Sequence, residues 1–306
     1  MQILVTGGSG FIGSHLVGHF QQRASIRVLD NLSFGFRSNL AGLDCDFIHG
    51  SILDPPTLRS AMRGVDFVFH LAAMISVPES MDKPAACNQL NVLGTLNVLE
   101  EAARSGVKKL ILSSSAAIYG DNPAVPKRED MIPEPASPYA ITKLDGEYYC
   151  RLFSATRALP TVALRYFNVF GPRQNPGSAY AAAIPIFIHQ ALRGLPLTVH
   201  GDGGQTRDFI SVRDIARANA FFATDSPAAG VFNIARGGSL SIRDLASHII
   251  RLTGSKSAII HGPPRPGDVR HSTASLDKTT AAGFTPEFNF DDALLETINY
   301  FKTTLD

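Results

Sequence analysis

The chain has 306 residues, of which 44% are hydrophobic and 18% charged, and 28 Lys and Arg residues nearly balance 27 Asp and Glu residues, for a formal net charge of +1. This composition excludes a disordered, collagenous or coiled-coil chain, and the balanced charge argues against a dedicated nucleic-acid-binding protein. The length fits one large α/β unit or two fused lobes.

The cysteines and histidines carry no recognisable ligand pattern. Three cysteines stand without a CxxC pair and nine histidines without a metal-ligand spacing, which argues against a disulfide framework and a metal site. The chain opens on Gln2-Ile3-Leu4-Val5-Thr6 rather than on a cleavable leader, and no apolar run is long enough to cross a bilayer. We therefore expect a soluble cytoplasmic protein that binds neither a membrane, nor nucleic acid, nor a metal.

Short apolar runs alternate with amphipathic segments through the first half of the chain. Each run is apolar at successive positions, which is typical of strands buried on both faces of a parallel sheet. Repeated strand–helix alternation predicts a doubly wound α/β sheet with right-handed crossovers. The expected strands are Ile3–Thr6, Ile26–Asp30, Asp46–His49, Phe67–His70, Leu110–Ser113 and Thr161–Tyr166, and the expected helices are Phe11–Gln22, Thr57–Met62, Asn88–Arg104 and Tyr139–Thr156.

The second half of the chain has a less regular pattern. Helices are expected at Ala182–Arg193, Val212–Phe222 and Ile242–Leu252, with loops and turns rich in glycine and proline between them. We predict a nucleotide-binding domain over residues 1–167. A smaller substrate-binding domain is predicted over residues 168–306, with some of its segments returning to the first domain.

A glycine-rich turn, Gly7-Gly8-Ser9-Gly10-Phe11-Ile12-Gly13, follows the first strand and opens a helix. Its glycines allow a sharp turn and a close backbone approach to a pyrophosphate, and the helix N-terminus offers free N–H groups. Asp30 ends the second strand about twenty residues further on, where a carboxylate accepts the ribose hydroxyls of NAD and repels the 2′-phosphate of NADP. The alternative is that Asp30 is only a turn residue. In addition, Arg37 could bind the 2′-phosphate of NADP, so the choice between NAD and NADP stays open.

The segment Tyr139-Ala140-Ile141-Thr142-Lys143 contains a Tyr-x-x-x-Lys pair. Residues four apart lie on one face of a helix, so the phenol and the ammonium group can face one site. A neighbouring positive charge favours the phenolate and lowers the tyrosine pKa, which makes Tyr139 a candidate proton acceptor for an alcohol. The serine run Ser113-Ser114-Ser115 ends a strand at the edge where open α/β sheets hold ligands, so a hydroxyl there can align the reacting oxygen.

Taken together, these motifs and Arg165-Tyr166-Phe167-Asn168 resemble the extended short-chain dehydrogenase/reductase family, and within it the UDP-hexose 4-epimerases. The similarity runs through nearly the whole chain and includes the segment from Gly201 to Ile210. The stretch from Tyr166 to Pro185 is most similar to the branch that acts on N-acetylated sugars.

The resemblance implies three groups of site residues. The catalytic group is Ser115, Tyr139 and Lys143. The implied contacts with NAD come from Gly7, Gly10, Phe11, Ile12, Asp30, Asn31, Ser33, Gly35, Ser51, Ile52, Leu71, Ala72, Ala73, Tyr139, Lys143 and Tyr166. The implied contacts with a UDP-sugar come from Ser76, Val77, Ser115, Tyr139, Asn168, Ala183, Val199, Arg207, Arg265, Asp268 and Ser272, with Asn168 and the arginines at the phosphates and Ala183 and Val199 around the uridine. The family also implies a homodimer formed through the helices at 88–104 and 139–156.

Four positions discriminate within the family. Ala116 and Ala117 stand where sugar-nucleotide 4,6-dehydratases carry an acidic pair, and Asn168 stands where glucuronate-type epimerases usually have threonine. Ser272 aligns with a bulky tyrosine of epimerases restricted to glucose and galactose, and leaves room for an N-acetyl group.

We therefore expect inversion at C4 of UDP-GlcNAc and UDP-GalNAc, and also of UDP-Glc and UDP-Gal, through a 4-keto intermediate. A UDP-glucuronate 4-epimerase, another NAD-dependent sugar-nucleotide dehydrogenase or dehydratase, and a non-catalytic NAD-sensing protein stay as alternatives.

Overall fold

The computed structural model describes residues 1–175, 182–264 and 269–304. Its centre is a seven-stranded sheet in the order β11-β6-β5-β4-β1-β2-β3, with all neighbouring strands parallel. The strands are β1 (Gln2–Thr6), β2 (Ser25–Asp30), β3 (Asp46–His49), β4 (Phe67–His70), β5 (Lys109–Ser115), β6 (Thr161–Tyr166) and β11 (Gly230–Ile234). The predicted doubly wound, Rossmann-like α/β fold is confirmed.

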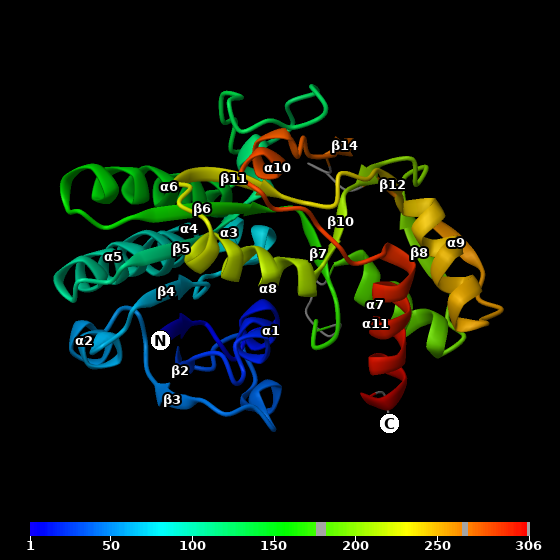
Figure 1. Ribbon diagram of the computed structural model, residues 1–306. Helices are drawn as coiled ribbons and strands as arrows, with labels where there is room; N and C mark the ends of the chain where they lie inside the picture. Colours follow the sequence, from blue (N-terminus) through cyan, green and yellow to red (C-terminus); the bar gives the residue numbers. More distant parts are fainter. Residues whose placement is uncertain (176–181, 265–268, 305–306) are drawn as a thin grey trace.

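The sheet is buried on both faces, because successive strand residues enter different cores. In β1, Ile3 and Val5 belong to one apolar cluster and Leu4 to another. Helices α1 (Phe11–His19) and α8 (Val212–Ala220) cover the first face. The other face is covered by α2 (Pro55–Met62), α5 (Gly94–Arg104) and α6 (Pro138–Thr156), and the two layers are visible in Figure 1.

The central sheet also contains a strand from the second half of the chain. β11 pairs in parallel with β6 and extends the sheet at one edge, although no strand was expected at 230–234. Helix α8, from the same half, packs against α1 in the same apolar cluster. The first layer is therefore completed by segments beyond residue 167, and the division of the chain at that residue stays a prediction.

The remaining part of the second half has a core of its own. Helices α7 (Ala183–Leu192), α9 (Ile242–Thr253) and α11 (Phe290–Thr304) pack around the short strands β7 (Asn168–Phe170), β8 (Leu197–His200) and β10 (Phe209–Ser211), on the right of Figure 1. Smaller elements complete the chain: α3 (Val77–Asp82), α4 (Pro84–Asn88), α10 (Asp277–Ala281), β9 (Thr206–Arg207), β12 (Leu240–Ser241), β13 (Ile259–Gly262) and β14 (His271–Ser272).

Two expected helices differ from those in the structure. The helix expected at Phe11–Gln22 ends at His19, and Gln22 has φ 64°, which no α-helix accommodates. The helix expected at Asn88–Arg104 is interrupted by a π-helical turn at Gln89–Leu93, from which the buried Asn91 binds both backbone groups of Met74. Within the described ranges, no helix is long and apolar enough to cross a membrane.

Candidate active site

A cavity of about 660 Å³ lies at the carboxyl ends of β1, β2, β4, β5 and β6. This is where the strand order reverses on either side of β1, the usual ligand position of an open α/β sheet. Every residue that the resemblance placed at the cofactor lines this cavity. The three catalytic candidates line it as well.

Two positions in the turn after β1 have no room for a Cβ atom and therefore require glycine. Gly7 has φ 74°, and a Cβ atom on it would lie 2.7 Å from the backbone nitrogen of Ala72. A Cβ atom on Gly13 would lie 2.3 Å from the carbonyl oxygen of Gly7. Helix α1 begins after Gly10, and its N-terminus has no side-chain cap. The free N–H groups and the close backbone approach fit a pyrophosphate, as NAD would supply.

Asp30 is buried at the end of β2 and is held by two backbone groups. Its Oδ2 accepts a hydrogen bond from the Ser9 N–H at 2.9 Å, and its Oδ1 accepts one from the Leu32 N–H at 2.8 Å. Asp30 therefore does form the turn that was considered as the alternative. Each carboxylate oxygen retains a further lone pair, however, so the same group can accept the hydroxyls of a ribose in the cavity.

The catalytic candidates come from the carboxyl end of β5 and the N-terminal part of α6. Ser115 is the last residue of β5, and Tyr139 stands in the first turn of α6, whose N-terminus is capped by the Ser137 side chain. The Ser115 hydroxyl lies near the Tyr139 phenol, since both side chains line the same cavity and the serine acts to lower the pKa of the tyrosine. Lys143 lies one turn further along α6, with its Nζ 5.7 Å from the centre of the Tyr139 ring and 2.8 Å from the Ser113 carbonyl oxygen.

Burial dominates the titration of the two α6 residues. It raises the pKa of Tyr139 above its ordinary value, partly opposed by the nearby Ser115 hydroxyl, and it lowers the pKa of Lys143 to about 8. The expectation of a lowered tyrosine pKa is therefore wrong for the chain alone. A cationic nicotinamide ring in this cavity would favour the phenolate and so oppose the effect of burial.

A second cavity, of about 630 Å³, adjoins the first and shares Val169 and Ala182 with it. Asn168, Ala183 and Arg207, which the resemblance placed around the nucleotide of the substrate, line this second cavity. Val199 does not. Its side chain is fully buried in the core under α7, because residues alternate along β8 and it is Thr198 and His200 that face the cavity.

The other substrate candidates are distributed more widely. Ser272 pairs with Arg207 across the β14–β9 ladder, which sets it beside the second cavity without lining it. Ser76 lines the first cavity and caps α3, whereas Val77 starts that helix, is 39% exposed and lines neither cavity. Arg265 and Asp268 lie outside the described residues.

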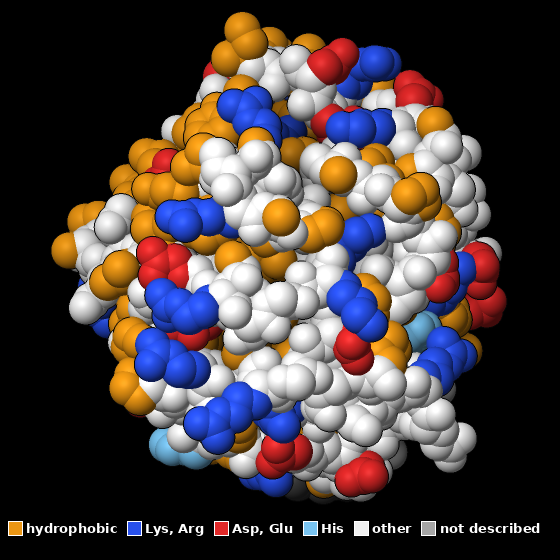
Figure 2. Space-filling view, turned by 60° about the vertical axis from the view of Figure 1, so that its left-hand side comes forward, with side chains coloured by type: hydrophobic (Ala, Val, Ile, Leu, Met, Phe, Trp, Pro, Cys, Tyr) orange, Lys and Arg blue, Asp and Glu red, His pale blue; other side chains and the backbone are white. Residues whose placement is uncertain are grey.

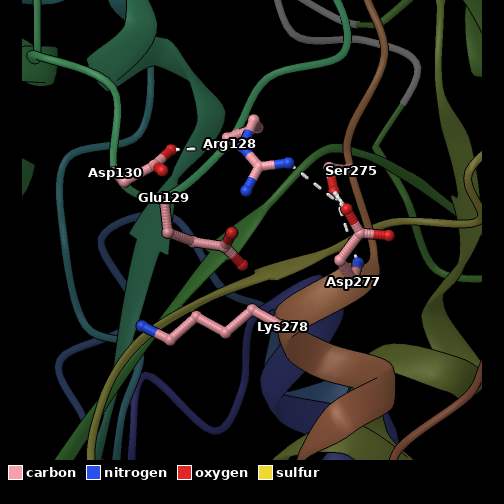
Figure 3. Close-up of a pocket in the computed structure, with 6 residues that line it drawn as sticks. All are labelled: Arg128, Glu129, Asp130, Ser275, Asp277 and Lys278. Atoms are coloured by element: carbon pink, nitrogen blue, oxygen red, sulfur yellow. Dashed lines mark hydrogen bonds and ion pairs between the residues drawn. The ribbon is translucent and has the colours of Figure 1, made fainter.

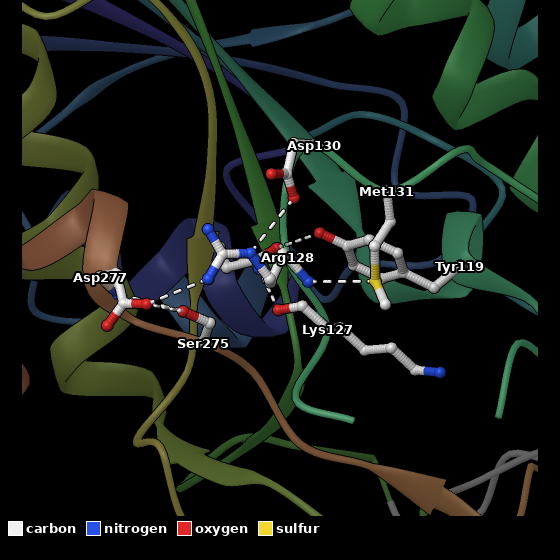
Figure 4. Close-up of polar contacts among 8 residues, drawn as sticks. Tyr119, Lys127, Arg128, Asp130, Met131, Ser275 and Asp277 are labelled. Atoms are coloured by element: carbon white, nitrogen blue, oxygen red, sulfur yellow. Dashed lines mark hydrogen bonds and ion pairs between the residues drawn. The ribbon is translucent and has the colours of Figure 1, made fainter. Parts of the chain in front are cut away.

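A third, strongly charged cavity lies between residues 128–130 and 275–278 (Figure 3). Arg128 forms ion pairs with Asp130 at 3.3 Å and with Asp277 at 3.4 Å, and so joins the two segments (Figure 4). The other two charged side chains have partners outside the cavity: Glu129 accepts a hydrogen bond from the Asn233 N–H at 2.7 Å, and Nζ of Lys278 lies 4.8 Å from the centre of the Phe232 ring. The Tyr119 hydroxyl, drawn in the same view, donates to Asn233 at 2.7 Å. Because each charged side chain of this cavity already has a partner, it offers no evident ligand site.

Sequence reasoning gave no role in cofactor binding to Arg173 and Gln174. Both line the first cavity from the loop after β7, a segment that was used only for its resemblance to the branch acting on N-acetylated sugars. The available signal was the placement of two long polar side chains directly after a strand at the ligand-binding edge of the sheet.

The chain is similar to known proteins over nearly its whole length. The family model described as "NAD dependent epimerase/dehydratase family" matches residues 3–235. The chain is 40% identical to the solved UDP-N-acetylglucosamine 4-epimerase of Methanobrevibacter ruminantium M1 in complex with UDP-N-acetylmuramic acid, with a TM-score of 0.96 over 99% of this chain and 98% of that one. It is 39% identical to the UDP-glucose 4-epimerase of Thermotoga maritima with UDP-glucose, with a TM-score of 0.96 over the whole of both chains.

Two further comparisons bear on cofactor and reaction. The UDP-glucose 4-epimerase of Thermus thermophilus, solved in complex with NAD, is 35% identical with a TM-score of 0.91 over 99% of both chains. A UDP-N-acetyl-alpha-D-glucosaminuronate decarboxylase of Bacillus cytotoxicus is also 35% identical, over 98% of this chain and 97% of its own. The choice between reactions therefore depends on individual site residues.

Proposed function

The chain belongs to the NAD dependent epimerase/dehydratase family, and on that premise we propose that it is an NAD-dependent UDP-sugar 4-epimerase that accepts UDP-GlcNAc and UDP-GalNAc as well as UDP-Glc and UDP-Gal. The observation that carries the proposal is the Ser115–Tyr139–Lys143 group at the edge of the dinucleotide cavity, directly beside a second cavity of nucleotide-sugar size. Such a group serves proton transfer at a hydroxyl of the sugar.

The three residues of this group have different proposed roles in the reaction. The Tyr139 phenolate accepts the proton of the sugar 4-hydroxyl, and the Ser115 hydroxyl, which lines the same cavity, holds the reacting oxygen in line. Lys143 places a positive charge on the same helix face and favours the phenolate once the cofactor adds its own charge. The chemistry that bound NAD would supply is a reversible acceptance of hydride from C4, so the net redox change would be zero.

Binding of the nucleotide lets the sugar turn without leaving. Asn168 and Arg207, in the second cavity, are proposed to hold the diphosphate while the 4-keto hexose rotates and presents its other face. Binding energy from the non-reacting part of the substrate thus retains an intermediate that must move. Ala116 and Ala117, which follow Ser115 in a 3₁₀ turn, offer neither an acid nor a base, which disfavours dehydration.

The proposed breadth of substrate rests on Ser272. We expect the wild-type protein to interconvert both pairs of UDP-sugars and to leave UDP-GlcA unchanged. A Ser272→Tyr variant should lose roughly tenfold or more of its activity on UDP-GlcNAc, because the ring crowds the substituent on C2, and should retain its activity on UDP-Glc. Chromatographic separation of the C4 epimers after incubation with each UDP-sugar measures all of these activities.

Ser272→Ala is the matched control, since it keeps the space open and should preserve both activities. Wild-type turnover of UDP-GlcA alone would contradict the proposed function. Equal losses on both substrates in Ser272→Tyr would contradict the assigned role of residue 272.

A homodimer through α5 and α6 is part of the proposal. Ile141, Tyr148 and Leu152 on α6 are each about half exposed, as is Leu93 just before α5. Figure 2 shows hydrophobic side chains gathered toward the left of that face of the molecule. Paired apolar helices of this kind are commonly buried against a second copy.

A further inference from the structure

Two neighbouring residues in the loop after β7 carry unused polar atoms. The Nη1 atom of Arg173 and the Oε1 atom of Gln174 are buried and have no hydrogen-bond partner in the described part of the chain. Both residues line the first cavity. A buried donor or acceptor without a partner costs free energy, so two such atoms on neighbouring residues of a cavity wall indicate a bound group that satisfies both.

The loop is held in place against α1. The carbonyl oxygen of Pro172 is 2.9 Å from Nε2 of His15, in the second turn of that helix. Gly171 packs so closely that a Cβ atom on it would lie 2.4 Å from Val212 and 3.5 Å from the ring of Phe11. Arg173 then adopts φ 68°, a left-handed conformation that costs a non-glycine residue energy and persists where surrounding contacts enforce it.

The Gln174 side chain has a defined orientation. Its Nε2 donates a hydrogen bond to the Val169 carbonyl oxygen at 3.2 Å. The amide nitrogen is thereby committed to the protein, and the oxygen is the atom left for a ligand. Gln174 therefore offers an acceptor beside the donor of Arg173.

The surroundings of Arg173 lack a compensating negative charge. Among the described residues, no Asp or Glu forms an ion pair with it. Its neighbour His15 is neutral at physiological pH, since burial lowers the pKa of that imidazole to about 4. A guanidinium group in this position is suited to phosphate oxygens.

We infer that Arg173 and Gln174 form a phosphoribosyl-binding pair, in which the guanidinium group binds a phosphate and the amide oxygen accepts a ribose hydroxyl. NAD and a UDP-sugar both carry this chemistry. The dinucleotide is favoured, because both residues line the cavity that contains Gly10 and Phe11 and neither lines the cavity of Asn168 and Arg207. The inference rests on the proposed function only for the identity of these two ligands.

The test compares Arg173→Met and Gln174→Met with wild type and with Arg193→Met, which removes an exposed arginine that lines neither cavity. NAD retained after exhaustive dialysis is quantified. Protein freed of nucleotide is then titrated calorimetrically with NAD and, separately, with UDP. We expect Arg173→Met to weaken NAD binding about ten- to hundredfold, the range for a hydrogen bond to a charged group, with Arg173→Lys recovering part of the loss.

The two binding measurements distinguish which ligand, NAD or the UDP-sugar, Arg173 and Gln174 bind. Weaker NAD binding with unchanged UDP binding assigns the pair to the cofactor, and the converse assigns it to the nucleotide of the substrate; either result supports the pair. Unchanged affinity for both ligands overturns it. A lower melting temperature of the ligand-free Arg173→Met protein, with both ligands weakened equally, also overturns it by showing a structural role. Failure of the wild type to bind either ligand would instead refute the proposed function.

Discussion

A Tyr139→Phe variant is expected to lose between about a hundredfold and ten-thousandfold of its turnover, the contribution of a positioned acid–base group. The substitution removes only the phenolic oxygen, which is the atom proposed to take the 4-hydroxyl proton in the cavity that Ser115 also lines. The ring and its packing stay. Retention of NAD and affinity for UDP should therefore stay close to wild type, and the loss should appear in kcat rather than in KM.

Tyr148→Phe is the matched control for this variant. Tyr148 lies on the same helix but is 51% exposed and lines none of the three cavities. The substitution keeps the ring that the proposed dimer would bury and does not touch the site, so turnover should be unchanged. Turnover of Tyr139→Phe within a fewfold of wild type would show that another group accepts the proton.

A Glu147→Gln variant should lose about 3–5 kcal/mol of unfolding free energy, measured by denaturant titration. Glu147 is paired with Arg165 through bonds of 2.9 and 2.7 Å, and both side chains are only 4% exposed. Glu147 also accepts a hydrogen bond from Ser114 at 2.5 Å, which an amide oxygen can preserve. The loss thus arises because the guanidinium charge stays buried without its counter-ion.

Two further variants of the chain test this explanation. Adding Arg165→Met to Glu147→Gln removes the uncompensated charge and should restore much of the stability, since neutral replacement of a buried pair is often tolerated. Arg128→Gln breaks ion pairs that are largely exposed (Figures 3 and 4) and should change stability by less than about 1 kcal/mol. A Glu147→Gln effect as small as that of Arg128→Gln would contradict the stabilising role of the buried pair.

The main sheet could largely be predicted from sequence, because burial on both faces leaves continuous apolar runs such as Ile3–Thr6 and Phe67–His70. β11 was missed because its five residues begin with an exposed glycine and contain Asn233, whose burial is compensated by hydrogen bonds from distant segments. The helix α11 was missed although Phe290, Leu294 and Phe301 mark a buried helical face.

The site shows the same division between local and tertiary information. The glycine turn and the Tyr139–Lys143 pair are local patterns, so both could be predicted from the sequence. In the structure both line the first cavity. Val199 was misplaced because the face of a short strand that meets a cavity depends on how its sheet packs. Arg173 was overlooked because its unpaired Nη1 atom becomes evident only once the loop is folded against α1.

The central claim is that the hydrogen on C4 leaves the sugar and returns to the same carbon on the opposite face. The most direct measurement uses UDP-glucose and UDP-N-acetylglucosamine with deuterium at C4, incubated in ordinary water with the purified protein and analysed by NMR spectroscopy. We predict C4-inverted products that retain deuterium at C4. Inverted products that have exchanged the deuterium for solvent hydrogen would contradict the account.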